Sequence, residues 1–565
     1  MKKTYLITLL IFLFFAAKAQ NYVAIGDSCF KVQDYLCAAK NYDLFLEKIE
    51  SRSNMIAYNS AKAWSLAGDK ERTIAAVKIY VANSYENNDL IFSDRLIKEK
   101  AFDFVKNDVR FKEILAAVVA KESVIKQAEK KKLDSMIAYQ NNLEKEGIFH
   151  KLKLANISAI AVYNNIKAYN TYPAIKHELI SMQFKLSDSL HTAFLVALPK
   201  DYDARKSYAL LFFLHGAVNM NIGYPDYSDE SDTTGWNRYY TKYAKLNKVI
   251  MVYPSGNRDY NWMYPDKGFY MIPAMLKQIK EVINVDDNRV FISGHSNGAT
   301  GSFSYAMKQP SPFSGFYGFN TRPRVATGGT YIRNILNRSF FNVSVDQDYY
   351  YPPQANDSLN KVMKDLHADY QDHRYNGFPH WFPQFNESEP AYKLLFNDLI
   401  KRKRDPFRPS VNWECDDVKY GRCDWISITA LDTATATKAA WQTHVNFKIN
   451  KWIVLDKASK PIIRDTIMNG FNYRKRSGAI EANYKNNIFK IKASNVKSIR
   501  LYLSPGMVDF KKPITVFVNG IIYYHAKPDY DKGFIINEYK STLDKVALWV
   551  NKIDVVVSKP ANLKM

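Results

Sequence analysis

The five residues Gly294-His295-Ser296-Asn297-Gly298 constrain the fold of this chain more than any other segment. They follow the apolar run VFIS, which is typical of a buried strand, and they precede ATGSFSYAMKQ, which is typical of a helix. Glycines two residues before and two residues after a serine allow a sharp strand-to-helix turn that exposes the serine above a sheet. The segment therefore predicts a G-x-S-x-G nucleophile elbow.

Strand and helix signals alternate around this motif. YALLFFLHG, KVIMVYP and SFFNVSV are short apolar runs suited to buried strands, and FYMIPAMLKQIKEVINV has the apolar spacing of a helix. This alternation favours a mostly parallel sheet covered by helices on both faces. We expect this α/β domain to span residues 176–404.

The flanking segments show other patterns. Residues 1–19 combine two lysines, an apolar run too short to span a bilayer and small residues, which predicts a secretory signal peptide cleaved near Ala19. Residues 20–121 resemble tetratricopeptide-type helical repeats, which either bind a protein partner or simply pack against the rest of the chain. Residues 122–175 predict a helical connector, and residues 405–565 predict a β-rich accessory domain.

Composition excludes several classes of protein. Hydrophobic residues make up 47% and charged residues 24% of the chain, which argues against disorder, collagen, coiled coil and a multi-pass membrane protein. The formal net charge is +23, but the lysines are scattered, so a basic solvated surface explains the charge without a nucleic-acid partner. We expect no integral membrane segment once the signal is removed.

Four cysteines would enter an oxidising compartment after export, where disulfides persist. Cys415 and Cys423 flank a glycine-containing turn, and a hairpin there would bring their sulfur atoms together. Cys29 and Cys37 have the same spacing, but buried free cysteine on helices is the common alternative for them. We therefore favour the Cys415–Cys423 bridge over the Cys29–Cys37 bridge, and neither spacing fits a zinc site.

A serine hydroxyl is a weak nucleophile at neutral pH, so a catalytic Ser296 requires a histidine base and an acid. Behind a nucleophile elbow these partners follow in the chain order Ser, Asp or Glu, His. Asp346 and Asp348 come at the carboxyl end of a predicted strand, where an open α/β sheet carries its functional loops. Both remain candidates for the acid at this point.

Three histidines lie between Ser296 and the end of the predicted α/β domain. His367 belongs to a helical stretch and His373 to a strand-like one, where a structural role is the simpler explanation. His380 follows an Asn-Gly pair in a loop just past that strand, where a base must project. We expect His380 to be the base.

Acyl transfer also needs hydrogen-bond donors for an oxyanion. The backbone N–H of Asn297 is one expected donor, and the N–H of Ala217 or Val218 in the loop after LLFFLHG is the other. His215 is expected to orient that loop. We expect no cofactor or metal, because the nearby acidic residues lack convincing ligand spacing and suit a solvated loop: Asp226, Asp229, Glu230 and Asp232.

Three tryptophans are candidates for the substrate cleft. Trp236, Trp262 and Trp381 are expected in loops, where their rings would stack on sugars or phenolic acids, although core packing explains any one of them equally well. His295, inside the elbow, is a further candidate for substrate contact.

Residues 207–383 resemble secreted bacterial esterases related to polyhydroxybutyrate depolymerases and to feruloyl or acetylxylan esterases. The resemblance rests on LLFFLHG, on YPSG followed by Trp262, and on NVDDNRVFISGHSNGA, SVDQDYYYP and GFPHW. It implies an α/β-hydrolase fold with Ser296 as nucleophile, Asp348 as acid and His380 as base. The sequence departs from the family at Ala299 and in HGAV, which leaves the substrate open.

The sequence therefore predicts a secreted or periplasmic serine carboxylic-ester hydrolase that forms an acyl-enzyme, acting on carbohydrate-linked or polymer esters. Two alternatives stay open: a serine peptidase that uses the same three residues, and a binding or scaffolding protein with a retired hydrolase core. The complete set of Ser296, Asp348 and His380 argues against the second alternative.

Overall fold

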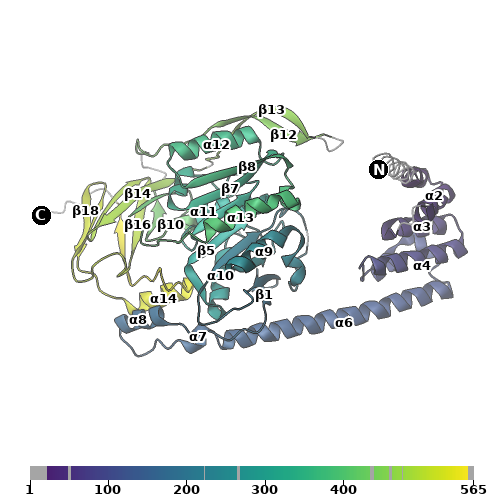
Figure 1. Cartoon of the computed structure of the whole chain (residues 1–565), viewed down its shortest axis with the longest axis horizontal. Coiled ribbons are helices and arrows are strands. Elements are labelled where there is room, and N and C mark those ends of the chain that lie inside the picture. The colour runs from purple at the N-terminus through teal and green to yellow at the C-terminus, as the bar shows by residue number, and fades with distance from the viewer. Residues whose placement is uncertain are drawn as a thin grey trace, which may run out of the picture. The chain divides into compact units, whose positions relative to one another are not determined.

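The computed structural model describes residues 22–48, 52–221, 223–263, 268–432, 438–456, 461–473 and 475–557. The expected signal peptide, residues 1–19, lies outside these ranges. The chain divides into two compact units, residues 1–135 and 136–565 (Figure 1). This division falls within one long helix, whereas the sequence predicted boundaries near residues 121 and 175.

The described part of the first unit is helical. A helix over residues 22–31 is followed by α2 (Tyr35–Lys48), α3 (Asn54–Leu66), α4 (Lys70–Glu86), α5 (Ser93–Lys98), a 3-10 turn (Lys100–Phe104) and the start of α6 (Val109–Lys145). The side chains of Ser53 and Asp69 cap α3 and α4 by accepting backbone N–H groups of the first turn. Small and aromatic side chains fill the core between these helices, among them Ala57, Ala61 and Trp64. Whether these helices are tetratricopeptide-type repeats stays a prediction.

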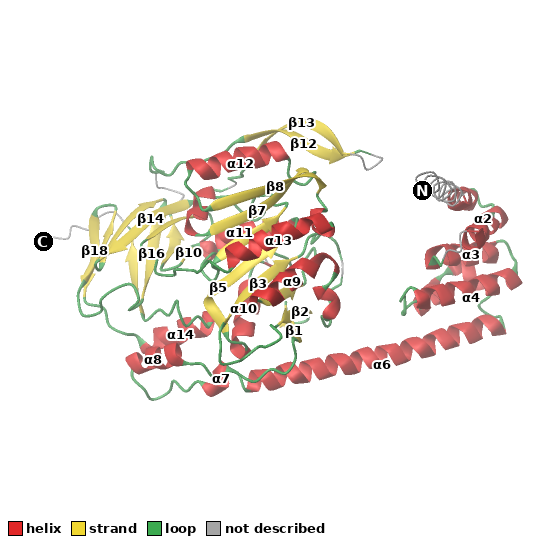
Figure 2. Ribbon diagram, in the orientation of Figure 1, coloured by secondary structure: helices red, strands yellow, loops and turns green. Residues whose placement is uncertain are grey.

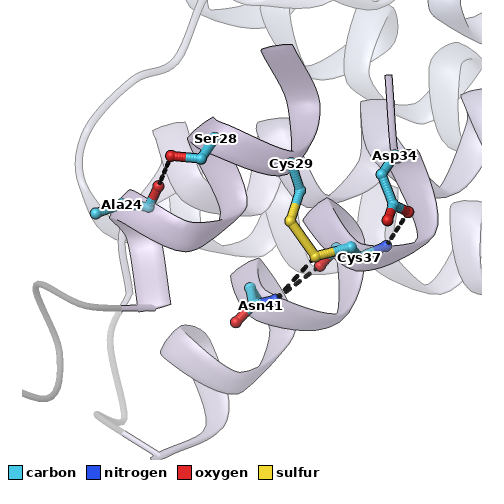
Figure 3. Close-up of a disulfide and its surroundings, with 6 residues drawn as sticks. All are labelled: Ala24, Ser28, Cys29, Asp34, Cys37 and Asn41. Carbon is cyan, nitrogen blue, oxygen red and sulfur yellow. Dashed lines mark hydrogen bonds between the residues drawn. A yellow bond between two sulfur atoms is a disulfide. The ribbon is translucent and has the colours of Figure 1, made fainter. Parts of the chain in front are cut away.

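The disulfide prediction was wrong. Cys29 and Cys37 form the bridge, which links the helix over residues 22–31 to α2 (Figure 3), while Cys415 and Cys423 are free and buried. Cys415 ends a strand that pairs with the strand of Gly478, whereas Cys423 pairs with Ile426 in a different sheet. A hairpin therefore does not join the two sulfur atoms.

An eight-stranded mixed sheet organises the second unit (Figure 2). Its strands are β1 (Leu179–Lys185), β2 (His191–Ala197), β3 (Tyr208–Leu214), β4 (Ile250–Pro254), β5 (Val285–Gly294), β6 (Gly315–Phe319), β7 (Ser339–Gln347) and β8 (Tyr370–Pro379). The order is β1-β2-β4-β3-β5-β6-β7-β8; β1 and β2 run antiparallel to their neighbours, and β3 to β8 are parallel. This order, with a sharp turn into a helix after β5, is the arrangement of the α/β-hydrolase fold.

Helices cover both faces of this sheet. On one face α9 (Arg238–Asn247) and α13 (Glu389–Leu399) pack against Leu211 and Phe213 of β3. On the other face α10 (Met271–Val282), α11 (Asn297–Lys308) and α12 (Pro353–Asp365) form a core with Leu210 and Phe212. Because neighbouring residues of a strand face opposite sides, burial on both faces explains why β3 is apolar throughout.

The C-terminal part of the unit is mostly β-structure. Two sheets enclose a core of their own: β10 (Arg422–Cys423), β11 (Ile426–Leu431), β16 (Val496–Leu503) and β19 (Asn551–Val556) form one, and β18 (Ile521–Ala526), β17 (Ile514–Val518), β15 (Ile488–Ser494), β14 (Gly478–Lys485) and β9 (Ser410–Cys415) form the other. Asn519 and Gly520, both with positive φ, make the two-residue turn between β17 and β18.

Three short helices and a separate ribbon complete the unit. Helices α7 (Ile148–Lys151) and α8 (Ala159–Ala168) share a small core with α14 (Lys532–Thr542). Among the described strands, β12 (Lys448–Leu455) and β13 (Pro461–Asn469) form a two-stranded sheet of their own. Within the described ranges, none of the helices has the length and apolarity needed to cross a membrane.

Candidate active site

Ser296 lies in the turn between β5 and α11 with a backbone φ of 57° and ψ of −118°. This conformation is strained for a residue with a side chain and is typical of functional positions. A Cβ atom on Gly298 would lie 1.8 Å from the carbonyl oxygen of Leu214, and one on Gly294 would lie 2.3 Å from the carbonyl carbon of Gly298. The backbone therefore packs too closely at both glycines for any side chain, which explains the G-x-S-x-G spacing.

His380 and Asp348 form a buried pair beside this turn. The His380 Nδ1 atom lies 2.7 Å from Asp348 Oδ1, and the side chains are 1% and 2% exposed. The two residues follow β8 and β7, which are adjacent parallel strands, so their loops emerge at the same edge of the sheet. The imidazole plane is thereby held by the carboxylate, with Nε2 left for another partner.

The backbone of His380 is fixed from two further sides. Asn320 Nδ2 and His295 Nε2 donate hydrogen bonds to the carbonyl oxygen of His380 over 2.7 Å and 2.9 Å. The rings of His295 and His380 are 4.9 Å apart, which places His380 next to the residue that precedes Ser296. Among the hydrogen bonds of the described residues, none joins Ser296 Oγ to His380, and such bonds often tighten only when substrate binds.

The geometry distinguishes the candidates that the sequence left open. Asp346 accepts hydrogen bonds from the backbone N–H groups of Gly377 and Phe378 over 2.8 Å and 3.2 Å, so its carboxylate ties β7 to β8 and does not hold the base. His373 stacks on Phe341 within the sheet. Of the two candidate acids, Asp348 is the one that contacts His380.

The loop after β3 lies directly against the serine. A Cβ atom on Gly216 would be 3.2 Å from Ser296 Cβ and 3.7 Å from its Oγ. His215 Nε2 accepts from the Gly256 N–H over 3.0 Å, so its proton sits on Nδ1, 2.7 Å from the carbonyl oxygen of Gly216. Burial lowers the pKa of His215, which keeps the ring neutral for this role.

The three expected oxyanion donors belong to two segments that adjoin Ser296, the start of α11 and the loop after β3. The N–H of Asn297 is at the first position of α11, where a helix has no internal acceptor for it. Ala217 has a φ of 56° and, with Val218, follows Gly216 in the loop that touches Ser296. In the described part of the chain, no hydrogen bond uses the N–H of Asn297, Ala217 or Val218 as donor.

Two of the three predicted tryptophans border the site. Trp236 and Trp381 are 36% and 45% exposed, and their rings meet edge to face at 6.0 Å. Trp262 is 0% exposed and packs against His215, so its predicted contact with substrate is not supported. His295 is 6% exposed and bonds to the backbone of His380, which makes it a positioning residue instead of a substrate contact.

Tyr349 and Tyr350, which directly follow Asp348, contact the candidate catalytic residues, and the sequence did not predict these contacts. The Tyr350 hydroxyl accepts a hydrogen bond from Asn297 Nδ2 over 3.0 Å, and it lies 3.1 Å from Thr300 Oγ1. The ring of Tyr349 lies 4.9 Å from that of His380. The run of three tyrosines directly after Asp348 was the available signal in the sequence.

No family model matches this chain, and no curated protein does. Among solved structures it is similar to a thermostable esterase, with 19% identity, a TM-score of 0.33 and coverage of 40% of this chain and 64% of the other. An S-formylglutathione hydrolase from Staphylococcus aureus has 18% identity and a TM-score of 0.30, with coverage of 40% of this chain and 98% of the other. A ferulic acid esterase has 15% identity and a TM-score of 0.31, with coverage of 39% of this chain and 97% of the other. The chain thus spans less than two thirds of the thermostable esterase, and similarities this distant do not decide its activity.

Proposed function

We propose that this chain is a serine carboxylic-ester hydrolase that acts through Ser296, His380 and Asp348. The observation that carries this proposal is the buried His380–Asp348 pair beside a serine held at positive φ in a strand-to-helix turn. The strained turn is supported by two glycines whose positions accept no side chain, which is a costly arrangement for a protein that does not use the serine.

The mechanism follows from these positions. His380 Nε2 takes the proton of Ser296 as its Oγ attacks the ester carbonyl, and Asp348 stabilises the resulting imidazolium. The N–H groups of Asn297 and of Ala217 or Val218 stabilise the oxyanion. The protonated His380 then gives its proton to the departing alcohol, and water activated by the same histidine releases the acid from Ser296.

The proposal also covers the substrates, the export and a protein partner of this chain. Carbohydrate-linked or polymer esters are the proposed substrates, supported by the partly exposed rings of Trp236 and Trp381 at the site. Export past a cleaved signal peptide is supported by the Cys29–Cys37 disulfide, since such bonds persist in oxidising compartments. A protein partner for the helical first unit is the remaining part of the proposal.

Replacing Ser296 with alanine tests the proposal directly. We expect the variant to lose at least about a thousandfold in kcat/KM on a short-chain 4-nitrophenyl ester, because the acyl-enzyme is not formed. Ser304→Ala, which removes a hydroxyl bonded within α11, is the matched control and should keep its activity. Undiminished turnover by a pure, folded Ser296→Ala sample would contradict the proposal, and cleavage of peptides without cleavage of esters would favour a peptidase.

A further inference from the structure

A cavity of about 360 Å³ adjoins the proposed catalytic residues on the side of the acid loop. Arg322, Tyr349 and Tyr350 line it from the hydrolase sheet and its loops, and Trp452 and Arg464 line it from the β12–β13 ribbon together with three smaller side chains of that ribbon. The ribbon lies beside α12 (Figure 1), where its side chains pack on Tyr351 and Ala355.

The cavity shares two walls with the catalytic residues. Tyr349 packs on the ring of His380, and the hydroxyl of Tyr350 holds the side chain of Asn297 next to Ser296. Trp452 Nε1 donates a hydrogen bond to the carbonyl oxygen of Tyr349 over 3.0 Å, which fixes the ribbon to the loop that carries Asp348. The wall of the cavity therefore contacts His380 through Tyr349 and Asn297 through Tyr350.

The ribbon contributes to the cavity lining with one of its two faces. Trp452 and Arg464 are direct partners across the two strands, and side chains at such positions lie on the same face. Ile463 and Ile467, at alternate positions on β13, are 67% and 83% exposed and do not line the cavity. The register of the ribbon thus presents the tryptophan and the arginine to the cavity together.

The cavity is cationic. Among the described residues that line it, two carry guanidinium groups and none carries a carboxylate, and no salt bridge between described residues uses Arg322 or Arg464. The Arg322 guanidinium lies 5.0 Å from the centre of the Trp452 ring, a contact that keeps it close to the cavity without neutralising it. Guanidinium groups bind carboxylates through paired hydrogen bonds. Aromatic side chains stack on planar parts of a ligand that carries such a carboxylate.

We propose that this cavity binds a carboxylate group of the substrate, so that the enzyme selects esters that carry a carboxylate on the acyl or on the alcohol part. The inference rests on the proposed ester hydrolysis and specifies its substrate class. Arg322 and Arg464 bind the carboxylate, and Trp452 and Tyr349 line the cavity beside it.

Two pairs of esters test this selectivity and locate the carboxylate. The 4-nitrophenyl monoester of glutaric acid and its methyl-capped form differ by a carboxylate on the acyl part, and 4-acetoxybenzoate and its methyl ester differ on the alcohol part. We expect the wild-type protein to prefer the carboxylate member of at least one pair by about tenfold in kcat/KM. That preference should fall at least about threefold in Arg464→Gln or Arg322→Gln, and to about one in the double variant.

Lys393→Gln is the control for the overall positive charge of the protein. It removes one exposed cation on α13 that does not line the cavity, so the preference should stay at its wild-type value. A wild-type preference near one, or a preference that survives both arginine substitutions, would overturn the proposal. If the protein hydrolyses the esters in a Ser296-dependent way but does not prefer the carboxylate member of either pair, only the carboxylate site is contradicted. If it hydrolyses none of the four esters, the proposed function is overturned as well.

Discussion

His295 is a buried histidine of the elbow whose ring lies beside that of His380. Its Nε2 donates to the backbone of His380, and its ring lies 5.3 Å from that of Trp236. Burial, together with the neighbouring His380, lowers the pKa of His295 to about 3. The ring therefore stays neutral at ordinary pH and keeps one N–H directed at the carbonyl oxygen that it holds.

Because the pKa of His295 is lowered, the free energy of unfolding depends on pH. Between about pH 3 and about pH 6.5 the unfolded chain protonates this histidine and the folded chain does not, so the free energy of unfolding falls as pH drops, by about 1.4 kcal/mol per pH unit from His295. Above that window its effect on stability no longer changes with pH. We expect His295→Gln to lower this slope in denaturant titrations at a series of pH values. His191→Gln, at an exposed position, should keep the wild-type slope, and an equal slope in His295→Gln would contradict the assignment.

Chain order and the elbow are local signals of the sequence, and they are the basis for proposing Ser296 and His380 as catalytic residues. The expected substrate contacts had no such local signal. Chain order alone left Asp346 and Asp348 as candidate acids, because they are two residues apart. The hydrogen bonds of Asp346 to the next strand and of Asp348 to His380 separate them. Trp262 and Trp381 both lie in loops, and no local pattern shows that the first of these loops is buried.

At the scale of elements, the β12–β13 ribbon is the part that the sequence did not predict. Its residues alternate as strands do, and a β-rich segment was expected, but the ribbon joins neither of the two C-terminal sheets. Which strands pair is decided by contacts between distant segments, and here Trp452 meets Tyr349, 103 positions away. The same limit explains the wrong cysteine bridge, because Cys415 and Cys423 are close in sequence but belong to strands of different sheets.

In the whole molecule, the β-rich C-terminal segment and the eight-stranded sheet belong to one compact unit, residues 136–565. The buried ion pair of Arg404 with Asp544, at 2.7 Å, joins the two parts, and a second buried pair, Lys280 with Asp287 at 2.6 Å, lies within the α/β part. The backbone N–H of Lys545 also donates to Asp287 over 2.7 Å, so neighbouring residues after α14 are bound to both pairs. The paired side chains are at most 6% exposed, so removing one member leaves an uncompensated buried charge.

Asp544→Asn tests this connection. We expect the variant to lose about 3 kcal/mol or more of unfolding free energy, because Arg404 keeps its charge in a buried place. Asp554→Asn removes the partner of Arg500 in a surface pair and should cost no more than about 1 kcal/mol. Denaturant unfolding followed by intrinsic fluorescence and by loss of ester hydrolysis measures both variants. Equal, small effects would show that the buried pair does not hold the unit together.

Ser296 is proposed to be an activated nucleophile. Labelling of the intact protein with a fluorophosphonate, followed by peptide mass spectrometry, tests this role without any assumption about substrate, since only a serine activated by its base reacts. We expect one covalent adduct, on Ser296, that disappears in Ser296→Ala and is strongly reduced in His380→Ala. Absence of an adduct on Ser296 in well-folded protein, or equal labelling after loss of His380, would contradict it.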